Sequence, residues 1–189
     1  MTSEPAPEQD RDADPESVAR TILLDQLTGR ARSRAELAEK LRKRLVPEEI
    51  ATRLLDRFEE VGLIDDEAFA RSWIESRQSG RGLARRALAQ ELHRKCVAKE
   101  VAQEALAEVD PADEEAAARA LVRKKLRSLA RHDRTTATRR LVGMLARKGY
   151  NSGMAFAVVR SELEAHPAFG GEAEAAPDDG GADPLLDGP

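Results

Sequence analysis

Apolar residues recur along most of the chain at intervals of three and four, which is the spacing of an amphipathic helix. The clearest example lies between residues 37 and 58, where the apolar positions include Leu37, Leu41, Ile50, Leu54, Leu55 and Phe58. No segment alternates apolar and polar positions with β-branched residues, as a half-buried strand would. The pattern therefore predicts an all-α protein.

The same helical pattern occurs three times. The matching stretches are LAEKLRKRLVPEEIATRLL from Leu37, LAQELHRKCVAKEVAQEAL from Leu88 and LVGMLARKGYNSGMAFAVV from Leu141. They align without a gap, at offsets of 51 and then 53 residues, and the first offset extends upstream to a match between Ala19 and Ala70. Internal repetition at a nearly fixed period is typical of a repeat array.

Each repeat is expected to contain three helices. The predicted helices are 16–28, 33–44 and 47–60, then 66–78, 81–95 and 98–109, then 113–131, 134–148 and 151–165. The fold class is therefore all-α, with three tandem three-helix repeats that form an elongated, curved helical array. We divide the chain into repeats at 17–62, 63–110 and 111–166, flanked by acidic tails at 1–16 and 167–189 that are expected to be disordered.

Local signals mark where several helices begin and end. Ser33 followed by Glu36 is a capping box. Gly29 and Gly62 follow the ends of predicted helices, where a left-handed backbone is common. The expected helix caps of the third repeat are Asp133 and Asn151.

The stretch GLIDDEAFARSWIESR, residues 62–77, raises the question of whether its acids form a catalytic cluster. Three acids, Asp65, Asp66 and Glu67, lie at the start of the predicted helix, and a similar acidic run, DPADEE, lies at the start of the corresponding helix of the next repeat. Recurrence at the same position favours helix capping by Asp65, with Asp66 in the first turn. Phe69 and Trp73 are four residues apart and are expected to share a buried face. The alternative for these aromatics is an exposed platform for base stacking.

The net charge of −4 conceals an uneven distribution. Residues 1–16 carry −5 and residues 167–189 carry −6, whereas residues 17–166 hold 30 bases and 23 acids. Within that body, residues 77–148 hold 18 bases and nine acids. A basic middle points to an anionic partner, either nucleic acid or an acidic protein groove. The alternative is a solvated charged surface.

Several classes of protein receive no support from the sequence. Cys96 is the only cysteine, so no intramolecular disulfide can form, and a cytoplasmic location is expected. No apolar run approaches about 20 residues, so we expect no membrane association. The histidines are scattered, and no phosphate-binding glycine loop or nucleophile elbow occurs. We therefore expect no enzymatic activity, no cofactor and no metal site, which leaves binding.

Four arginines lie four residues apart in the predicted helix 113–131, with no acid between them on that line. They would form a stripe about 18 Å long, and a planar guanidinium suits phosphate and carboxylate recognition. The alternative is a solvated helix face. With the basic residues of the neighbouring helices, the candidate binding residues are Arg81, Arg85, Arg86, Lys95, Arg119, Arg123, Lys124, Lys125, Arg127, Arg131, Arg139, Arg140, Arg147 and Lys148.

Taken together, these features resemble the RecX family, the bacterial regulators of the RecA recombinase. The resemblance covers about residues 17–165 and rests on the three repeats, on SRAELAEKLRKR, on the run from Gly62 and on the late RRLVGMLARKGY. The family pattern of a glycine, two apolar residues, two aspartates and a phenylalanine is matched by Gly62, Leu63, Ile64, Asp65, Asp66 and Phe69. Lys148-Gly149 matches the family turn before a third helix. Arg44-Leu45 and Lys95-Cys96 do not, so we expect their backbones to differ.

The resemblance implies a monomeric modulator without enzymatic activity that acts in DNA repair, recombination and the SOS response. Such a protein would bind the RecA filament on single-stranded DNA, lie in its helical groove, and inhibit strand exchange and ATP hydrolysis. The resemblance also allows direct contact with single-stranded or double-stranded DNA. The alternative function is direct DNA binding by helix-turn-helix-like units.

Overall fold

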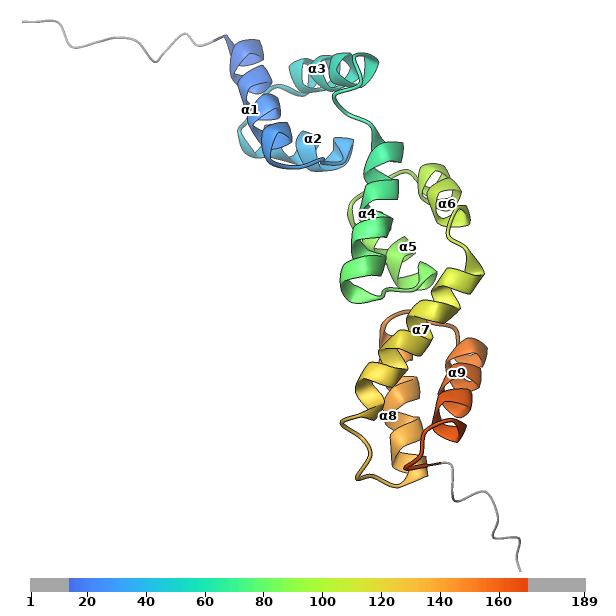
Figure 1. Ribbon diagram of the computed structural model, residues 1–189. Helices are drawn as coiled ribbons and strands as arrows, with labels where there is room; N and C mark the ends of the chain where they lie inside the picture. The colour runs from blue at the N-terminus through green and yellow to red at the C-terminus, as the bar shows by residue number, and fades with distance from the viewer. Residues whose placement is uncertain (1–13, 170–189) are drawn as a thin grey trace, which may run out of the picture.

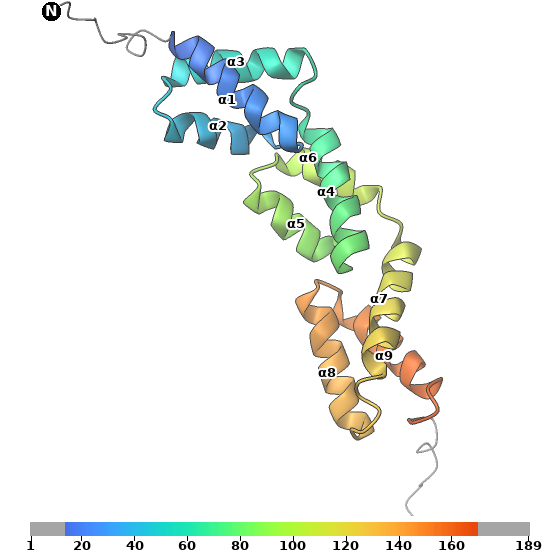
Figure 2. The same cartoon turned by 60° about the vertical axis from the view of Figure 1, so that its left-hand side comes forward.

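Nine α-helices follow one another along residues 14–169, the part of the chain that the computed structural model describes, and no strand occurs there (Figure 1). Their bounds are α1 Pro15–Gly29, α2 Arg34–Lys43, α3 Glu48–Glu60, α4 Asp66–Arg81, α5 Arg85–Arg94, α6 Lys99–Ala107, α7 Pro111–Leu126, α8 Arg134–Arg147 and α9 Ser152–Glu164. Successive groups of three helices stack end to end into an elongated array (Figures 1 and 2). The predicted fold class is confirmed. None of the described helices is long and apolar enough to cross a membrane.

Each repeat closes around its own apolar core. The aligned leucines of the second helix, Leu37, Leu88 and Leu141, are all fully buried, and so are their partners one turn later, Leu41, Leu92 and Leu145. In the first repeat they pack with Leu23 and Phe58, and in the third with Val122 and Val158. The repeat seen in the sequence is therefore a repeat of core positions.

Most of the predicted helix caps are present. Ser33 Oγ accepts a hydrogen bond from the Glu36 amide at 3.3 Å while Glu36 accepts one from the Ser33 amide, which completes the capping box. The side chains of Asp133 and Asn151 accept from the amides of Thr136 and Met154. Gly62 adopts a left-handed φ of 71°. Gly29 does not, because it is the last residue of α1, so that expectation was wrong.

Two predicted boundaries were also wrong. The helix α4 continues to Arg81 and is ended by Gly82, whose φ is 59°, so α5 begins only at Arg85. The helix α7 ends at Leu126, five residues before its predicted end. No proline or glycine interrupts residues 126–131, and the sequence therefore carries no signal for that end.

The folded body extends slightly beyond the predicted tails. Asp14 caps α1, and Pro15 and Glu16 lie within this helix, although the acidic tail was expected to reach residue 16. At the other end Phe169 is buried, and its carbonyl oxygen accepts a hydrogen bond from Arg134 at 3.0 Å. The rest of both predicted tails lies outside the described residues.

The turn between the second and third helices has a left-handed residue in every repeat. The φ angles are 58° at Leu45, 53° at Cys96 and 90° at Gly149. The expectation that the first two turns would differ in backbone from the third was therefore wrong. A left-handed backbone costs an ordinary L-residue about 1–2 kcal/mol, and the fold imposes this cost at Leu45 and Cys96.

The first and second repeats meet where the start of α2 contacts the second repeat. Ser33 Oγ donates to the carbonyl oxygen of Lys95 at 2.8 Å, and the Arg34 amide donates to Asp66 Oδ1 at 2.8 Å. Lys95 Nζ lies 2.6 Å from Glu36 Oε1. Burial alone would raise the pKa of Glu36, but the hydrogen bond and charge of Lys95 outweigh burial and lower that pKa.

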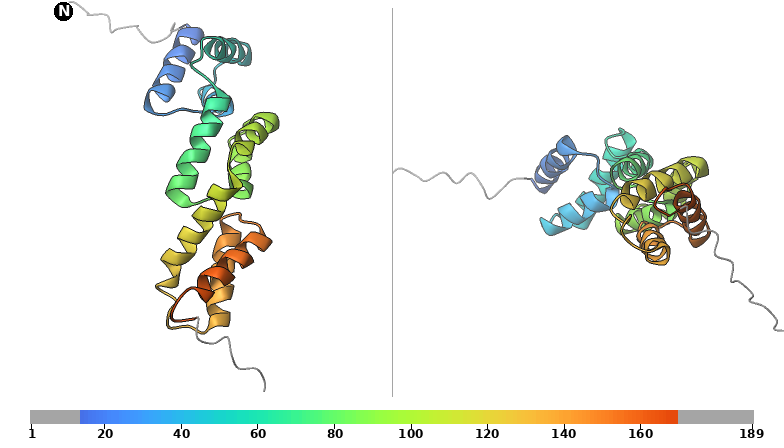
Figure 3. Two further views of the ribbon diagram at one scale, coloured as in Figure 1. Left: turned by 45° about the vertical axis from the view of Figure 1, so that its right-hand side comes forward. Right: turned by 60° about the horizontal axis from the view of Figure 1, so that its bottom comes forward.

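The second and third repeats meet in the same way, at the start of α5 (Figure 3). The Ala84 amide donates to the carbonyl oxygen of Lys148 at 2.9 Å, and the Arg85 amide donates to Glu114 Oε1 at 3.1 Å. Tyr150 is buried and its hydroxyl donates to the Gly82 carbonyl oxygen at 3.2 Å. Burial, with the charge of Glu114 nearby, raises the pKa of Tyr150 to about 12.

Candidate nucleic-acid interface of the third repeat

Positive charge is concentrated in one repeat. Residues 17–62 contain 10 bases and eight acids, and residues 63–110 contain eight bases and nine acids. Residues 111–166 contain 12 bases and six acids. The excess of positive charge in the body of the chain therefore belongs almost entirely to the third repeat.

A hollow between the end of α7 and α8 gathers four of these cations. It has a volume of about 540 Å³ and is lined by Lys125, Arg139, Arg140 and Arg147, together with Ser128, Leu129 and Met144. No acid lines it, and within residues 14–169 none of the four cations is in an ion pair. Arg140 is oriented by His132, whose Nε2 lies 2.8 Å from Arg140 NH1. We call this the α7–α8 basic hollow.

A second hollow, of about 620 Å³, lies at the junction of the second and third repeats. Its cations are Arg81, Lys124 and Lys148. Lys148 Nζ donates to the carbonyl oxygen of Arg81, and the Arg81 guanidinium lies 3.7 Å from Glu91. Lys124 and Lys125 are consecutive on α7: Lys124 lines the junction hollow and Lys125 lines the α7–α8 basic hollow. Positive charge therefore continues from the junction to the α7–α8 basic hollow.

The predicted arginine stripe is divided. Because α7 ends at Leu126, the four arginines do not lie along one helix: Arg127 follows the helix end and Arg131 lies in the connection to α8. Both are exposed. The two arginines within α7 point toward α9: Arg119 NH1 lies 3.3 Å and Arg123 Nε 2.7 Å from the buried carboxylate of Glu162. Half of the expected stripe is thus occupied in holding α7 to α9.

Glu162 shows how strongly this contact is formed. It is 6% exposed, and Arg123 binds both of its oxygens, at 2.7 and 3.0 Å. The hydrogen bonds from Arg123, followed by those from Arg119, lower the pKa of Glu162, although burial opposes them. A buried carboxylate needs such partners because an unpaired buried charge is very costly. Arg119 also pairs with Glu115 at 2.7 Å.

The remaining predicted cations serve different purposes. Arg85 Nε lies 3.0 Å from Glu114, and Lys95 pairs with Glu36, so both belong to the contacts between repeats. Arg86 is exposed and forms no ion pair within residues 14–169. The predicted cations therefore fall into three groups: residues at the junctions between repeats, Arg119 and Arg123 that pair with Glu162 of α9, and cations that remain available to a partner.

The acidic run at residues 65–67 has a structural role that the sequence revealed only in part. Asp65 Oδ1 accepts from the Ala68 amide at 2.8 Å and caps α4, as predicted. Asp66 lies in the first turn but binds the amide of Arg34, and so caps α2 of the preceding repeat. Burial raises the pKa of Asp66, against the opposing hydrogen bond from the Arg34 amide.

Phe69 is buried as predicted, but the prediction of a buried Trp73 was wrong. Trp73 is only partly buried at the edge of the second core and stacks on Phe69 with ring centroids 5.6 Å apart. Its Nε1 donates to Glu91 at 3.0 Å, and Arg77 lies 4.0 Å from the ring centroid. An indole with a polar partner favours such an edge position.

Sequence reasoning missed a hollow between α8 and α9. It has a volume of about 430 Å³ and is lined in part by Arg134, Thr138, Phe156 and Arg160. The aligned repeats did contain a signal, because Phe156 stands where the first repeat has Thr52. Among the described residues, no group of three or more His, Cys, Asp or Glu side chains could hold a metal ion.

Comparison with protein families identifies all three repeats. The family model for the first three-helix domain of RecX matches residues 19–58, that for the second domain matches 65–106, and that for the third matches 113–159. The regulatory protein RecX of Streptomyces coelicolor is 56% identical over 151 residues, which is 80% of each chain. That of Mycolicibacterium smegmatis is 50% identical over 173 residues, covering 86% of this chain and 92% of its own.

Solved structures agree on the fold. The crystal structure of RecX from Lactobacillus salivarius superposes with a TM-score of 0.73 at 18% identity, over 80% of this chain and 98% of that one. A second crystal structure of a regulatory protein RecX gives a TM-score of 0.70 at 22% identity. At such low identity the agreement concerns the arrangement of the helices.

Proposed function

The chain belongs to the RecX family, and from this premise we propose that it is a monomeric regulator without enzymatic activity that inhibits RecA in the cytoplasm. It would bind the filament that RecA forms on single-stranded DNA, lie along the groove of that filament, and reduce strand exchange and ATP hydrolysis. The array has a suitable form, because stacked three-helix repeats present a long surface to a partner.

One observation carries the proposal: the α7–α8 basic hollow has four cations and no lining acid. Phosphate groups of the DNA, or carboxylates of the filament, would bind there by charge-assisted hydrogen bonds. The arginines suit this role because their guanidinium groups bind oxyanions bidentately. Regulation would then follow from occupancy of the groove, with the third repeat binding the charged groups of the filament.

The test is RecA's DNA-dependent ATPase, measured with the purified protein at several salt concentrations. Replacing Arg139 and Arg147 by Ala should weaken inhibition and should reduce its salt dependence by about 0.7 in the log–log slope for each phosphate that the variant no longer binds. Helicity should be unchanged because Ala is a good helix former.

The matched control is Lys43→Ala, at the position of the first repeat that corresponds to Arg147. Lys43 is exposed and pairs with Glu39 on the same helix, so its loss should leave inhibition unchanged. If the double variant inhibits as well as the parent protein, the hollow is a solvated surface and the proposal fails.

The second candidate function is direct DNA binding, favoured by the same hollow and by the three-helix form of each repeat. It predicts that bare DNA is bound as tightly as the RecA filament. Measuring binding to single-stranded DNA with and without RecA separates the two functions.

The acidic ends, proposed as separate segments at 1–16 and 167–189, would compete with the anionic partner for the third repeat. Their charges of −5 and −6 support this role. Removing residues 1–13 and 170–189 spares every described helix and should strengthen binding at low salt. Weaker binding would show that an end itself contacts the partner.

A further inference from the structure

The outer face of α9 carries an exposed aromatic ring beside an arginine. Phe156 is 55% exposed, although Ala155, Val158 and Val159 on the same helix are buried in the third core. Arg160 follows one turn later, is exposed, and forms no ion pair within residues 14–169. Both side chains line the hollow between α8 and α9.

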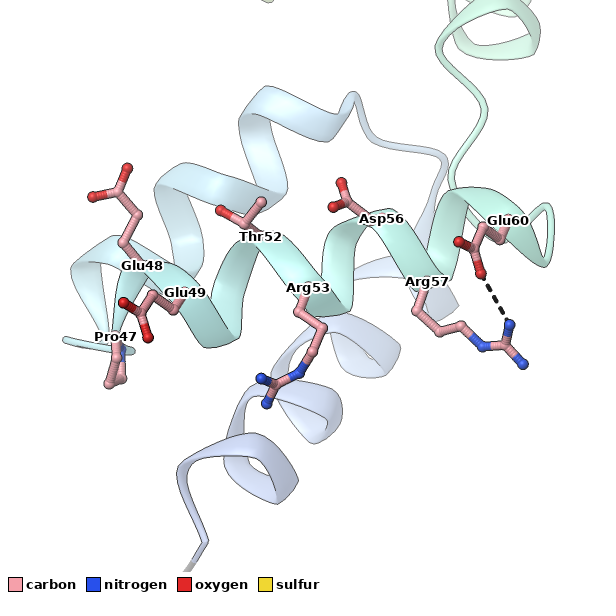
Figure 4. A pocket seen from close by; sticks show the side chains of 8 residues that line it. All are labelled: Pro47, Glu48, Glu49, Thr52, Arg53, Asp56, Arg57 and Glu60. Carbon is pink, nitrogen blue, oxygen red and sulfur yellow. Dashed lines mark hydrogen bonds and ion pairs between the residues drawn. The ribbon is translucent and has the colours of Figure 1, made fainter.

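The first repeat shows that the scaffold does not need an aromatic residue there. Through the offsets of the repeat, Phe156 corresponds to Thr52 and Arg160 to Asp56. Figure 4 shows that Thr52 and Asp56 project from the same side of α3 as Glu48, whereas Arg53 and Arg57 project from the opposite side. Asp56 is held by Arg34 at 2.6 Å. The side of the helix that carries these two positions is therefore polar and acidic in the first repeat, and aromatic and basic in the third.

The other cation of the hollow is already engaged. Arg134 donates to the Phe169 carbonyl oxygen at 3.0 Å, and its second terminal nitrogen lies 3.7 Å from Glu164. The Arg134 side chain is therefore held in place by contacts within the protein, and Arg160 is the cation of this hollow that remains available to a ligand. Thr138, on the same side of α8 as Arg134, adds a hydroxyl to the lining, although that hydroxyl donates to the Arg134 carbonyl oxygen.

We infer that Phe156 and Arg160 form a subsite for one nucleotide of single-stranded nucleic acid, with the base stacked on Phe156 and a neighbouring phosphate bound by Arg160. An exposed ring beside a cation suits this ligand because every base offers a π-face and every nucleotide a phosphate. A duplex fits less well, because its bases are already stacked on one another. The inference rests on the proposed function, since it assigns a strand contact to the same repeat.

The position of the subsite agrees with the basic surface already described. Arg139 and Arg140 follow Thr138 directly on α8 and line the α7–α8 basic hollow, whereas Thr138 lines the hollow of Phe156. The two hollows therefore lie on different sides of one helix. A strand bound in the first can reach the ring by crossing α8, a helix on which no acid follows its cap Asp133.

The test compares two labelled oligonucleotides of equal length, an oligothymidylate and an abasic strand with the same phosphates, bound by the full chain without RecA. Phe156→Ala should raise the Kd for oligothymidylate about five- to tenfold, the weaker end of the range for one stacked base, and leave the abasic strand unaffected. Phe156→Tyr should keep the preference for bases. Arg160→Gln should weaken both ligands and flatten the salt slope by about 0.7.

The control is Thr52→Ala on the corresponding face of the first repeat, which should change neither Kd. The inference is overturned if Phe156→Ala binds both strands like the parent protein. It is also overturned if this variant loses inhibition of RecA while its binding of oligothymidylate is unchanged, because the face would then contact protein. Failure of the proposed function looks different: the parent protein would leave the RecA ATPase unaffected and still prefer oligothymidylate to the abasic strand.

Discussion

The two junctions between repeats share one backbone arrangement but hold it with different chemistry. In both, the start of a second helix contacts the left-handed turn of the next repeat and is capped by a carboxylate of the next repeat's first helix. The first junction adds the hydroxyl of Ser33 and the ion pair between Lys95 and Glu36. The second junction uses the Ala84 amide, a buried Tyr150, a glycine packed on Ala87 and the ion pair between Arg85 and Glu114.

The difference shows which side chains the arrangement requires. The donor to the carbonyl oxygen of the turn can be a hydroxyl or a backbone amide, and the carboxylate that accepts from the amide at the helix start can belong to an aspartate or a glutamate. What distinguishes the second junction is the close approach of Gly149 to the backbone of Ala87, which packs the basic third repeat tightly against the second. Each junction also has one ion pair between repeats, Lys95–Glu36 in the first and Arg85–Glu114 in the second, so charge alone does not distinguish them.

The largest expected effect is that of Gly149→Ala at the second junction. A Cβ there would lie 2.5 Å from the Ala87 amide nitrogen, and φ is 90°. Backbone strain and overlap together should lower the free energy of unfolding by about 3 kcal/mol, measured by urea denaturation. The control in the same repeat is Gly143→Ala, which meets only the flexible end of Arg147 at 3.4 Å and should stabilise α8 by about 0.5–1 kcal/mol. Equal effects of the two substitutions would contradict the close approach.

Most of the fold was accessible from the sequence because helix formation and core periodicity are local signals. The buried leucines Leu37, Leu88 and Leu141 follow directly from the repeat. The junctions were not accessible, because their partners are far apart along the chain. Asp66 and Arg34 are 32 residues apart. In the local sequence Asp66 cannot be told from an acid whose only role is to interact favourably with the dipole of its own helix.

A smaller loss of stability is expected for the two capping carboxylates, and the second junction should again be the more sensitive. Glu114→Ala removes two hydrogen bonds to Arg85, one to the amide and one to the side chain, at a buried position, so we expect a loss of about 1–3 kcal/mol. Asp66→Ala removes one bond at a less buried position and should cost about 1 kcal/mol. The reverse order in urea denaturation would show that the first junction carries more of the stability.

The placement of the candidate cations was only partly predictable for the same reason. The excess of cations in the third repeat can be counted, and Arg139, Arg140 and Arg147 do line one hollow. The predicted arginine stripe is not free for a partner along its whole length, because Glu162 of α9, 39 residues from Arg123, accepts hydrogen bonds from Arg123. Availability of a cation depends on acids from other helices, and this property has no local signature in the sequence.

The first junction should also show opposing dependences on pH. The pKa of Glu36 is lowered from its ordinary 4.5, so its stabilising contribution is present above that value and is lost as pH falls through the folded-state pKa. The pKa of Asp66 is raised from 3.8, so this group has the opposite sign: its contribution improves as pH falls. Between about pH 6 and pH 3, Glu36→Gln should make the acid loss of stability shallower and Asp66→Asn should make it steeper. Slopes that change in the same direction would contradict this arrangement of charges.

The smallest expected effect concerns Cys96, which holds in the first junction the place that Gly149 holds in the second. Its φ of 53° costs an L-residue about 1–2 kcal/mol, whereas glycine pays about 0.5–1 kcal/mol of extra chain entropy on folding. Cys96→Gly should therefore raise the free energy of unfolding by a few tenths of a kcal/mol up to about 1 kcal/mol, and Cys96→Ala should leave it nearly unchanged because the strain remains. The exposed Cys96 side chain shows that the first junction has room for a Cβ where the second has none. If Cys96→Gly instead destabilises the protein as much as Gly149→Ala does, the cysteine makes a contact that closes the first junction, and the two junctions are equally tight.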